Sequence, residues 1–117
     1  MKARALIFVT MMSVSGAATA QPEMNTANAV MPGCRAVIAQ DKRDPFGIGR
    51  CVGLVEATMS LGSSLGGGLA FCFPEGVSSA QGVRIVVQYI EGRPARMQEN
   101  FVLLAVEAFR AAWPCKR

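Results

Sequence analysis

The chain has 117 residues, a length that suits a single domain. Of these residues 51% are hydrophobic, and the formal net charge is +4. Histidine is absent, which excludes the commonest general base, the commonest metal ligand and every nucleophile that needs an imidazole partner. The acidic residues follow no motif and the basic residues form no dense run, so we expect no enzyme, no metal or cofactor and no nucleic-acid binding.

The first twenty residues have the pattern of a secretion signal. Lys2 and Arg4 give a positive start, and an apolar run from Ala5 to Val14 follows. Ala18-Thr19-Ala20 is an A-x-A cleavage signature. An uncleaved membrane anchor is the alternative, but the run is much shorter than the roughly 20 residues that span a bilayer. We therefore predict a signal peptide over residues 1–20, export to the periplasm and no membrane span after cleavage.

The mature chain is expected to begin at Gln21. Removal of twenty residues leaves 97, and the net charge falls to +2 because Lys2 and Arg4 leave with the signal. The polar segment 21–28 is expected to be a flexible lead-in. The helical domain is then expected to span residues 29–117.

Two helices are predicted in the first half of this domain. Residues 29–40 are helical in character, and because proline lacks the backbone N–H, a helix either starts near Pro32 or kinks there. Asp41 to Arg50, rich in charges, glycine and proline, is expected to be a loop. Cys51 to Leu61 has apolar residues at helical spacing.

The segment from Gly62 to Gly68 is expected to be a Gly/Ser connector. It does not fit a phosphate-binding loop, because no Lys-Ser/Thr follows it and no strand precedes it. A short apolar stretch over 69–73 and a turn at Pro74-Glu75-Gly76 come next.

Two further helices are predicted after this turn. Ser78 to Gln81 has the Ser-x-x-Gln pattern of a capping box, which predicts a helix over about 78–91. Its β-branched residues would also suit a strand, but the cap and the helical spacing of its valines favour a helix. Gly92 and Pro94 are expected to end it. The last helix is predicted from near Ala95 to about Trp113.

The last helix is apolar over most of its surface. A solvated strip is expected only through Asn100, Leu103, Glu107 and Arg110. Such a helix lies at the centre of a domain or in an oligomer interface. Because four helices in 97 residues leave apolar surface uncovered, we expect a homodimer. The predicted fold is therefore a small all-α, disulfide-stabilised four-helix domain.

Four cysteines predict two disulfides: Cys34, Cys51, Cys72 and Cys115. A zinc site would need close pairs such as C-x-x-C, which the chain lacks. The last two helices are joined by a very short turn, so they should be antiparallel neighbours. Cys72 then lies beside Cys115, which leaves Cys34 to pair with Cys51. In the chain-entropy model these loops contribute about 4 and about 3 kcal/mol respectively.

The sequence around the cysteines carries a combined motif. Cys-x-Gly at 51–53 opens it, the block Cys-Phe-Pro-Glu-Gly-Val-Ser-Ser-Ala-Gln at 72–81 follows, and Val-Val-Gln-Tyr-Ile at 86–90 precedes Pro94. Ala108-Phe109 and Trp113-Pro114-Cys115 close it. Over about residues 29–115 the chain resembles the Rap/Tai family of immunity proteins, which guard bacteria against amidase toxins of type VI secretion.

The resemblance implies an all-α periplasmic protein, usually a homodimer, that binds a peptidoglycan amidase and plugs its cleft. Leu54-Val55 stands where the family usually has Tyr-Ile, and Ala57 stands where a second glycine often follows. Both departures keep the positions apolar or small, so they affect the expected partner specificity rather than the fold.

Two segments are candidates for the contact with such a partner. The charged segment offers Asp41, Lys42, Arg43, Asp44 and Phe46, and the glycine segment offers Ser63, Ser64, Gly66 and Gly67. Glycines allow close backbone approach, whereas charges and an aromatic make better anchors, so we favour the charged segment.

Two other functions fit the same residues. The protein would also suit a role as a periplasmic structural or adaptor protein of the same fold without a toxin partner. Its seven methionines suggest apolar ligand binding, but four of them, at 1, 11, 12 and 24, lie in the signal or lead-in.

Overall fold

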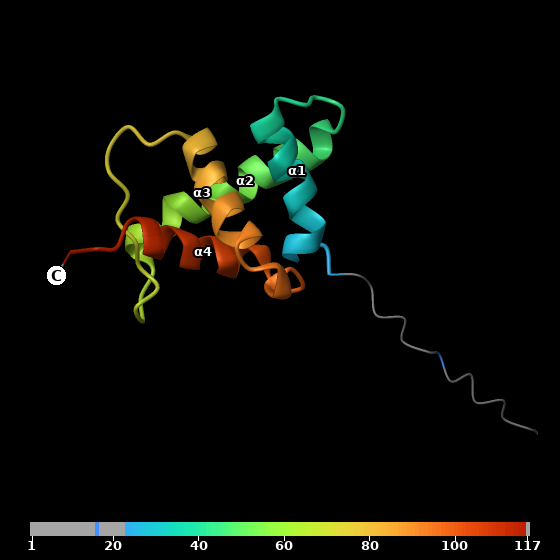
Figure 1. The fold of residues 1–117 in the computed structure, drawn as a ribbon. Helices are drawn as coiled ribbons and strands as arrows, with labels where there is room; N and C mark the ends of the chain where they lie inside the picture. The colour runs from blue at the N-terminus through green and yellow to red at the C-terminus, as the bar shows by residue number, and fades with distance from the viewer. Residues whose placement is uncertain (1–15, 17–22, 117) are drawn as a thin grey trace, which may run out of the picture.

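The computed structural model describes residue 16 and residues 23–116, and these fold into four α-helices (Figure 1). The elements are α1 Ala27–Ala39, α2 Pro45–Leu61, a 3₁₀ turn η1 Gly62–Ser64, α3 Ser79–Glu91, a 3₁₀ turn η2 Pro94–Arg96 and α4 Phe101–Ala112. This part of the chain contains no strand, only isolated bridges that join Thr26 to Asn100 and Phe71 to Pro114. The predicted all-α fold is confirmed.

The predicted signal peptide falls, apart from residue 16, outside the described residues. Within the described part, no helix combines the length and the apolar character that a membrane crossing requires.

Helix α1 is longer than the sequence pattern indicated. It begins at Ala27, where the Thr26 hydroxyl accepts a hydrogen bond from the Ala29 N–H at 3.3 Å, and Pro32 lies inside it. The helix ends at Gln40, whose left-handed backbone (φ 55°) turns the chain toward α2.

The predicted loop over residues 41–50 is wrong in its second half, because α2 begins at Pro45 rather than Cys51. The Asp44 carboxylate accepts a hydrogen bond from the Gly47 N–H at 2.9 Å, and Pro45 takes the first helical position. An N-terminal cap followed by proline starts a helix, and here it outweighs the weak helix propensity of Gly47 and Gly49.

The start of the last helix also differs from the prediction. Instead of a continuous helix from Ala95, the chain forms η2 and then enters α4 at Phe101. The Asn100 side chain accepts hydrogen bonds from the backbone N–H groups of Val102 (2.9 Å) and Leu103 (3.3 Å), which fixes this start. The longer connection still leaves α3 and α4 as packed neighbours.

Both predicted disulfides are present. Cys34 joins Cys51 with their Cα atoms 5.3 Å apart, and Cys72 joins Cys115 with a Cα separation of 4.8 Å.

The predicted helix over 78–91 is confirmed as α3, and the Ser78 hydroxyl accepts a hydrogen bond from the Gln81 N–H at 3.1 Å.

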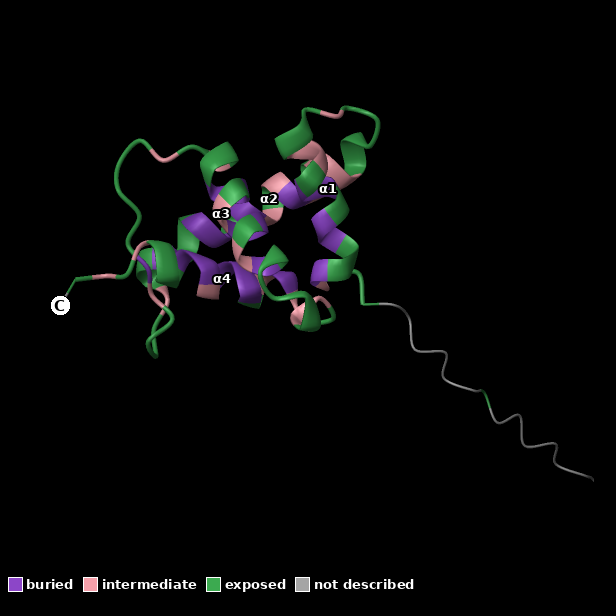
Figure 2. Ribbon diagram, in the orientation of Figure 1, coloured by how far each residue is buried: buried purple, intermediate pink, exposed green. Residues whose placement is uncertain are grey.

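The core lies between the four helices (Figure 2). Its largest fully buried side chains are Phe71, Phe101, Phe109, Met31, Ile90 and Leu104. Most apolar residues of α4 are buried within the single chain. The large apolar side chains that remain exposed are spread over several elements: Met24, Ile38 of α1, Phe46 and Leu61 of α2, Leu69 and Phe73 of the segment before α3, and Leu103 of α4.

Candidate functional site

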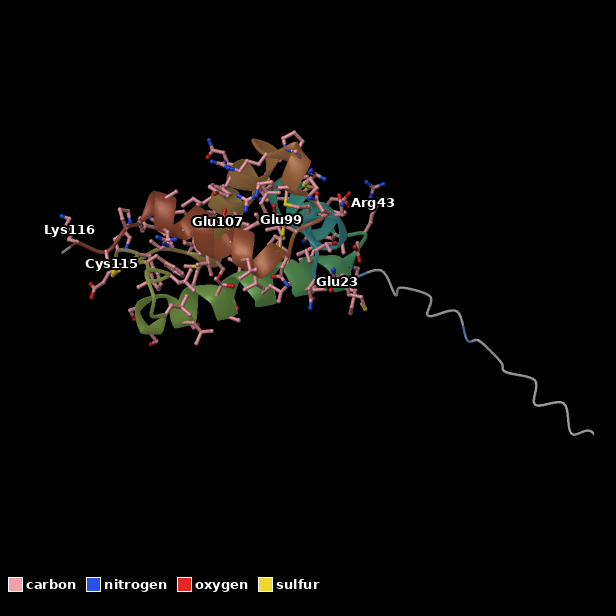
Figure 3. All side chains as sticks on the ribbon, turned by 90° about the horizontal axis from the view of Figure 1, so that it is seen from below. Glu23, Arg43, Glu99, Glu107, Cys115 and Lys116 are labelled. Atoms are coloured by element: carbon pink, nitrogen blue, oxygen red, sulfur yellow. A yellow bond between two sulfur atoms is a disulfide. The ribbon has the colours of Figure 1, made fainter. Side chains whose placement is uncertain are left out.

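The two candidate segments lie at opposite ends of α2 (Figure 1). At a rise of 1.5 Å per residue, the helix that separates them is roughly 24 Å long. In Figure 3 the labelled Arg43, of the first segment, lies at the opposite end of the described domain from Lys116, which lines a pocket together with Gly68 and Ala70. The structure therefore offers two separate surfaces in one chain, which we call the α1–α2 corner (residues 40–46) and the glycine loop (residues 62–70).

The polar residues of the α1–α2 corner are organised by local hydrogen bonds. The Arg43 guanidinium donates to both oxygens of the Asp41 carboxylate, at 2.9 Å from Nε and 2.6 Å from Nη2. These bonds lower the pKa of Asp41, and both groups stay at the surface. Asp44 is occupied by the cap of α2, while Lys42 is exposed.

Phe46 is the most exposed large hydrophobic side chain among the described residues, with 71% of its surface accessible. It stands on the first turn of α2, directly beside the point where α1 and α2 approach most closely. A methyl group added at Gly33 would lie 2.1 Å from the Gly47 carbonyl oxygen. Because this backbone contact and the Cys34–Cys51 disulfide fix the base of the corner, Phe46 is presented from a rigid support.

An open pocket of about 580 Å³ adjoins the corner. Its lining combines apolar walls with a polar rim: Ala36, Val37, Gln40, Asp41, Lys42, Ile48 and Val52. An apolar pocket with a few polar groups is a common form of binding site, and aromatic side chains often dominate the binding energy of protein interfaces. The pocket could not be predicted from the sequence, because its lining comes from α1 and from the first turns of α2, which begins six residues before the predicted start.

The glycine loop is slim and carries no charge. Ser63 and Ser64 lie in η1, and the exposed Gly66 and Gly67 follow, with Gly67 in the left-handed region (φ 62°). The buried Phe71 closes the loop by donating its N–H to the Gly62 carbonyl at 3.2 Å. The loop therefore projects from a fixed base and offers small polar side chains, backbone and the partly exposed Leu69, but no charge and no aromatic side chain.

A cluster of charged residues braces the connector between α3 and α4. Arg96 donates to the Glu107 carboxylate at 2.6 and 2.9 Å and to Glu99 at 2.7 Å, and Tyr89 donates to Glu107 at 2.8 Å. The hydrogen bonds from Arg96 lower the pKa of Glu107 to about 2, against the opposing effect of partial burial. Figure 3 shows Glu99 and Glu107 side by side.

The solvated strip predicted on α4 is wrong at two of its four residues. Leu103 and Arg110 are exposed as expected, but Glu107 is half-buried in the ion pair and Asn100 caps the helix. The spacing of Glu107 on α4 alone could not reveal a partner in the connector, because η2 was predicted to be part of the helix.

The described part of the chain contains no group of three or more acidic or cysteine side chains that could hold a metal ion. The features that this surface does offer are an exposed aromatic, an apolar pocket and a loop closed by the hydrogen bond between Phe71 and Gly62.

The comparisons with known proteins agree with a binding role. A family model described as Rap1a immunity proteins matches residues 17–115. No curated protein and no solved structure matches the chain.

Proposed function

Since the chain belongs to the family of Rap1a immunity proteins, we propose that it protects its cell by binding a secreted peptidoglycan amidase of type VI secretion in the periplasm. The observation that carries the proposal is that the family match extends over nearly the whole predicted mature domain. The signal-peptide pattern and the two disulfides support a periplasmic site, because disulfides persist in oxidising compartments.

The α1–α2 corner is our proposed contact with the amidase, in preference to the glycine loop. Phe46 supplies an exposed aromatic anchor, and the nearby pocket, lined by Lys42 among others, can receive an apolar side chain. The exposed Arg43 lies between Lys42 and Phe46 in the chain. A rigid support limits the conformational entropy that is lost on binding, which favours affinity. Residues 44–47 are held by the Asp44 cap and by the Gly33–Gly47 contact.

The test is inhibition of an amidase encoded next to the gene, measured as peptidoglycan hydrolysis at rising concentrations of this protein. We expect the wild-type chain to abolish hydrolysis and Phe46→Ala to raise the inhibitory concentration about tenfold or more, because truncation of a hot-spot aromatic costs about 2 kcal/mol. Arg43→Ala should have a smaller effect in the same direction.

Leu69→Ala is the matched control, since it truncates another partly exposed apolar side chain, at the other end of α2. If Leu69→Ala or a shortened glycine loop weakens inhibition and Phe46→Ala does not, the contact lies at the glycine loop. If the wild-type protein leaves the amidase fully active, the immunity function itself is wrong and the adaptor function becomes the better explanation.

We also propose that the protein acts as a homodimer through the outer faces of α2 and α4. The apolar groove there has a volume of about 130 Å³, and its lining is uncharged: Leu54, Ala57, Thr58, Leu61, Leu65, Val102 and Val106. Leu61, which lines the groove, is more than half exposed. A second copy would cover this apolar surface.

Light scattering on the purified mature protein tests the dimer. Leu61→Glu places a charge in this groove and should shift the mass from dimer to monomer. Ile38→Glu, which adds the same charge on exposed α1 surface, should remain dimeric. A wild-type protein that is monomeric at micromolar concentration contradicts this interface.

A further inference from the structure

The two disulfides differ in their access to solvent. Cys34 and Cys51 are both fully buried, with 0% of their surface accessible. Cys72 is exposed and Cys115 is partly exposed, close to the C-terminal end of the described chain (Figure 3). Thiol–disulfide exchange starts when a thiolate reaches one sulfur of the bridge, so only Cys72–Cys115 is open to attack in the folded protein.

A cationic pocket borders the accessible disulfide. It has a volume of about 280 Å³ and is lined by Gly68, Ala70, Arg110, Pro114, Cys115 and Lys116. No acidic residue lines it, and neither Arg110 nor Lys116 forms an ion pair with any other described residue. Positive charge next to a cysteine favours its thiolate, and a more stable thiolate leaves a disulfide faster.

Opening this bridge does not require the helices to separate. Phe71 stays buried, with its ring 5.1 Å from that of Phe109, and holds the base of the glycine loop. The disulfide covalently links the segment 72–78 to the C-terminal residues. A hydrogen bond from the Cys72 N–H to the Trp113 carbonyl, at 2.8 Å, joins the same two segments. Its reduction is therefore a local event.

We infer that Cys72–Cys115 is a thiol–disulfide exchange site for a dithiol reductase. A thiolate of the reductase attacks Cys72 Sγ, the electron pair of the S–S bond moves to Cys115 Sγ, and Cys115 leaves as a thiolate beside Arg110 and Lys116. The second thiolate of the reductase then attacks the sulfur of the reductase's first cysteine in the mixed disulfide, and Cys72 leaves as a thiolate. Two electrons and two protons pass from the dithiol to the bridge, and the reductase becomes a disulfide.

The reduced form keeps the four helices and the Cys34–Cys51 bridge, while the segment 72–78 is no longer covalently tied to the C-terminal residues and is held there only by non-covalent contacts. This site does not depend on the identity of the toxin partner, because it rests on access and charge around one disulfide. An experiment that disproves the exchange site would therefore leave the proposed immunity function unaffected.

The first experiment treats the folded mature protein with dithiothreitol, stops the reaction by alkylation at increasing times and maps the labelled cysteines by mass spectrometry. We expect Cys72 and Cys115 to be labelled at least about tenfold faster than Cys34 and Cys51, with the helical circular dichroism unchanged. Equal rates for the two pairs would show that both open by global unfolding, and would overturn the inference.

The second experiment tests the direction of the exchange. Thioredoxin whose second active-site cysteine is replaced by serine should become trapped on Cys72; a mixed disulfide on Cys115 would overturn the assignment of the leaving group. Arg110→Gln with Lys116→Gln should slow reduction about threefold, and Arg84→Gln, on exposed α3 surface outside the pocket, should not. An unchanged rate in the double variant excludes the electrostatic role of the pocket.

Discussion

The two helix hairpins of the molecule, α1–α2 and α3–α4, are held together by different kinds of contact. Helices α1 and α2 have a short connection and a buried disulfide between the helices themselves, where the backbones touch at Gly33 and Gly47. Helices α3 and α4 have a longer connection braced by ion pairs and an accessible disulfide at the open end. The first hairpin depends on close packing that leaves no room for added volume, whereas the second depends on contacts that respond to pH and to reductant.

The largest effect should come from removing the disulfides one at a time. Loop length alone ranks the Cys72–Cys115 bridge first, at about 4 kcal/mol against about 3 kcal/mol for Cys34–Cys51. Removal of two fully buried sulfurs adds about 1 kcal/mol each, so Cys34→Ala with Cys51→Ala should cost about 5 kcal/mol in the free energy of unfolding. Urea unfolding of the two double variants measures both costs, and a larger cost for the Cys72–Cys115 pair would contradict the packing argument.

Gly33→Ala should have the next largest effect on the same hairpin. The added methyl group meets the Gly47 carbonyl, which belongs to backbone and cannot rotate away, so we expect a loss of about 3 kcal/mol in unfolding free energy. Gly53→Ala on α2 is the matched control, because nothing lies within 4 Å of its added methyl group. It should be neutral or stabilise the helix by up to about 1 kcal/mol. Equal stability of the two variants would show that the α1–α2 contact can relax.

A smaller effect is expected from the ion pairs of the second hairpin. Because Arg96 lowers the pKa of Glu107 to about 2, below its value of 4.5 in the unfolded chain, the carboxylate stabilises the fold fully above about pH 4.5. This contribution is lost as the pH falls toward 2. Since Glu107 is about a third exposed, solvent screening reduces it to about 1 kcal/mol.

Unfolding of Glu107→Gln between pH 2 and pH 5 measures this contribution. The variant should lose the part of the pH dependence that the wild type shows in that range, and Tyr89→Phe, which removes only one hydrogen bond to Glu107, should lose less. A pH profile of Glu107→Gln that matches the wild type would show that the ion pair does not stabilise the fold.

Much of the fold could be predicted because it depends on local and periodic signals. The capping pattern at Ser78 and the valine stripe placed α3, and the neighbouring positions of Cys72 and Cys115 around the last two helices gave the correct pairing. The start of α2 was missed although Asp44-Pro45 is a local signal, because the glycines that follow were given more weight.

The candidate site was harder to predict because it is made by contacts between distant residues. Phe46 was identified from its type, but its pocket needs Val37 of α1 beside Ile48 and Val52 of α2. In the same way, the partner of Glu107 is Arg96, in a 3₁₀ turn that no periodic pattern marks. Whether a segment is a helix or a loop can be predicted from its own residues. A surface formed between two segments can be predicted only when their relative positions are known.

The order of the disulfides along the chain has a consequence for biogenesis. Cys34 pairs with Cys51 and Cys72 with Cys115, so the two covalent loops follow one another and neither encloses the other. Under the proposed export, with the N-terminus crossing the membrane first, the first loop can close before either cysteine of the second has emerged. Of the three possible connectivities, an oxidase that joins cysteines in order of appearance would then produce the native one without an isomerase.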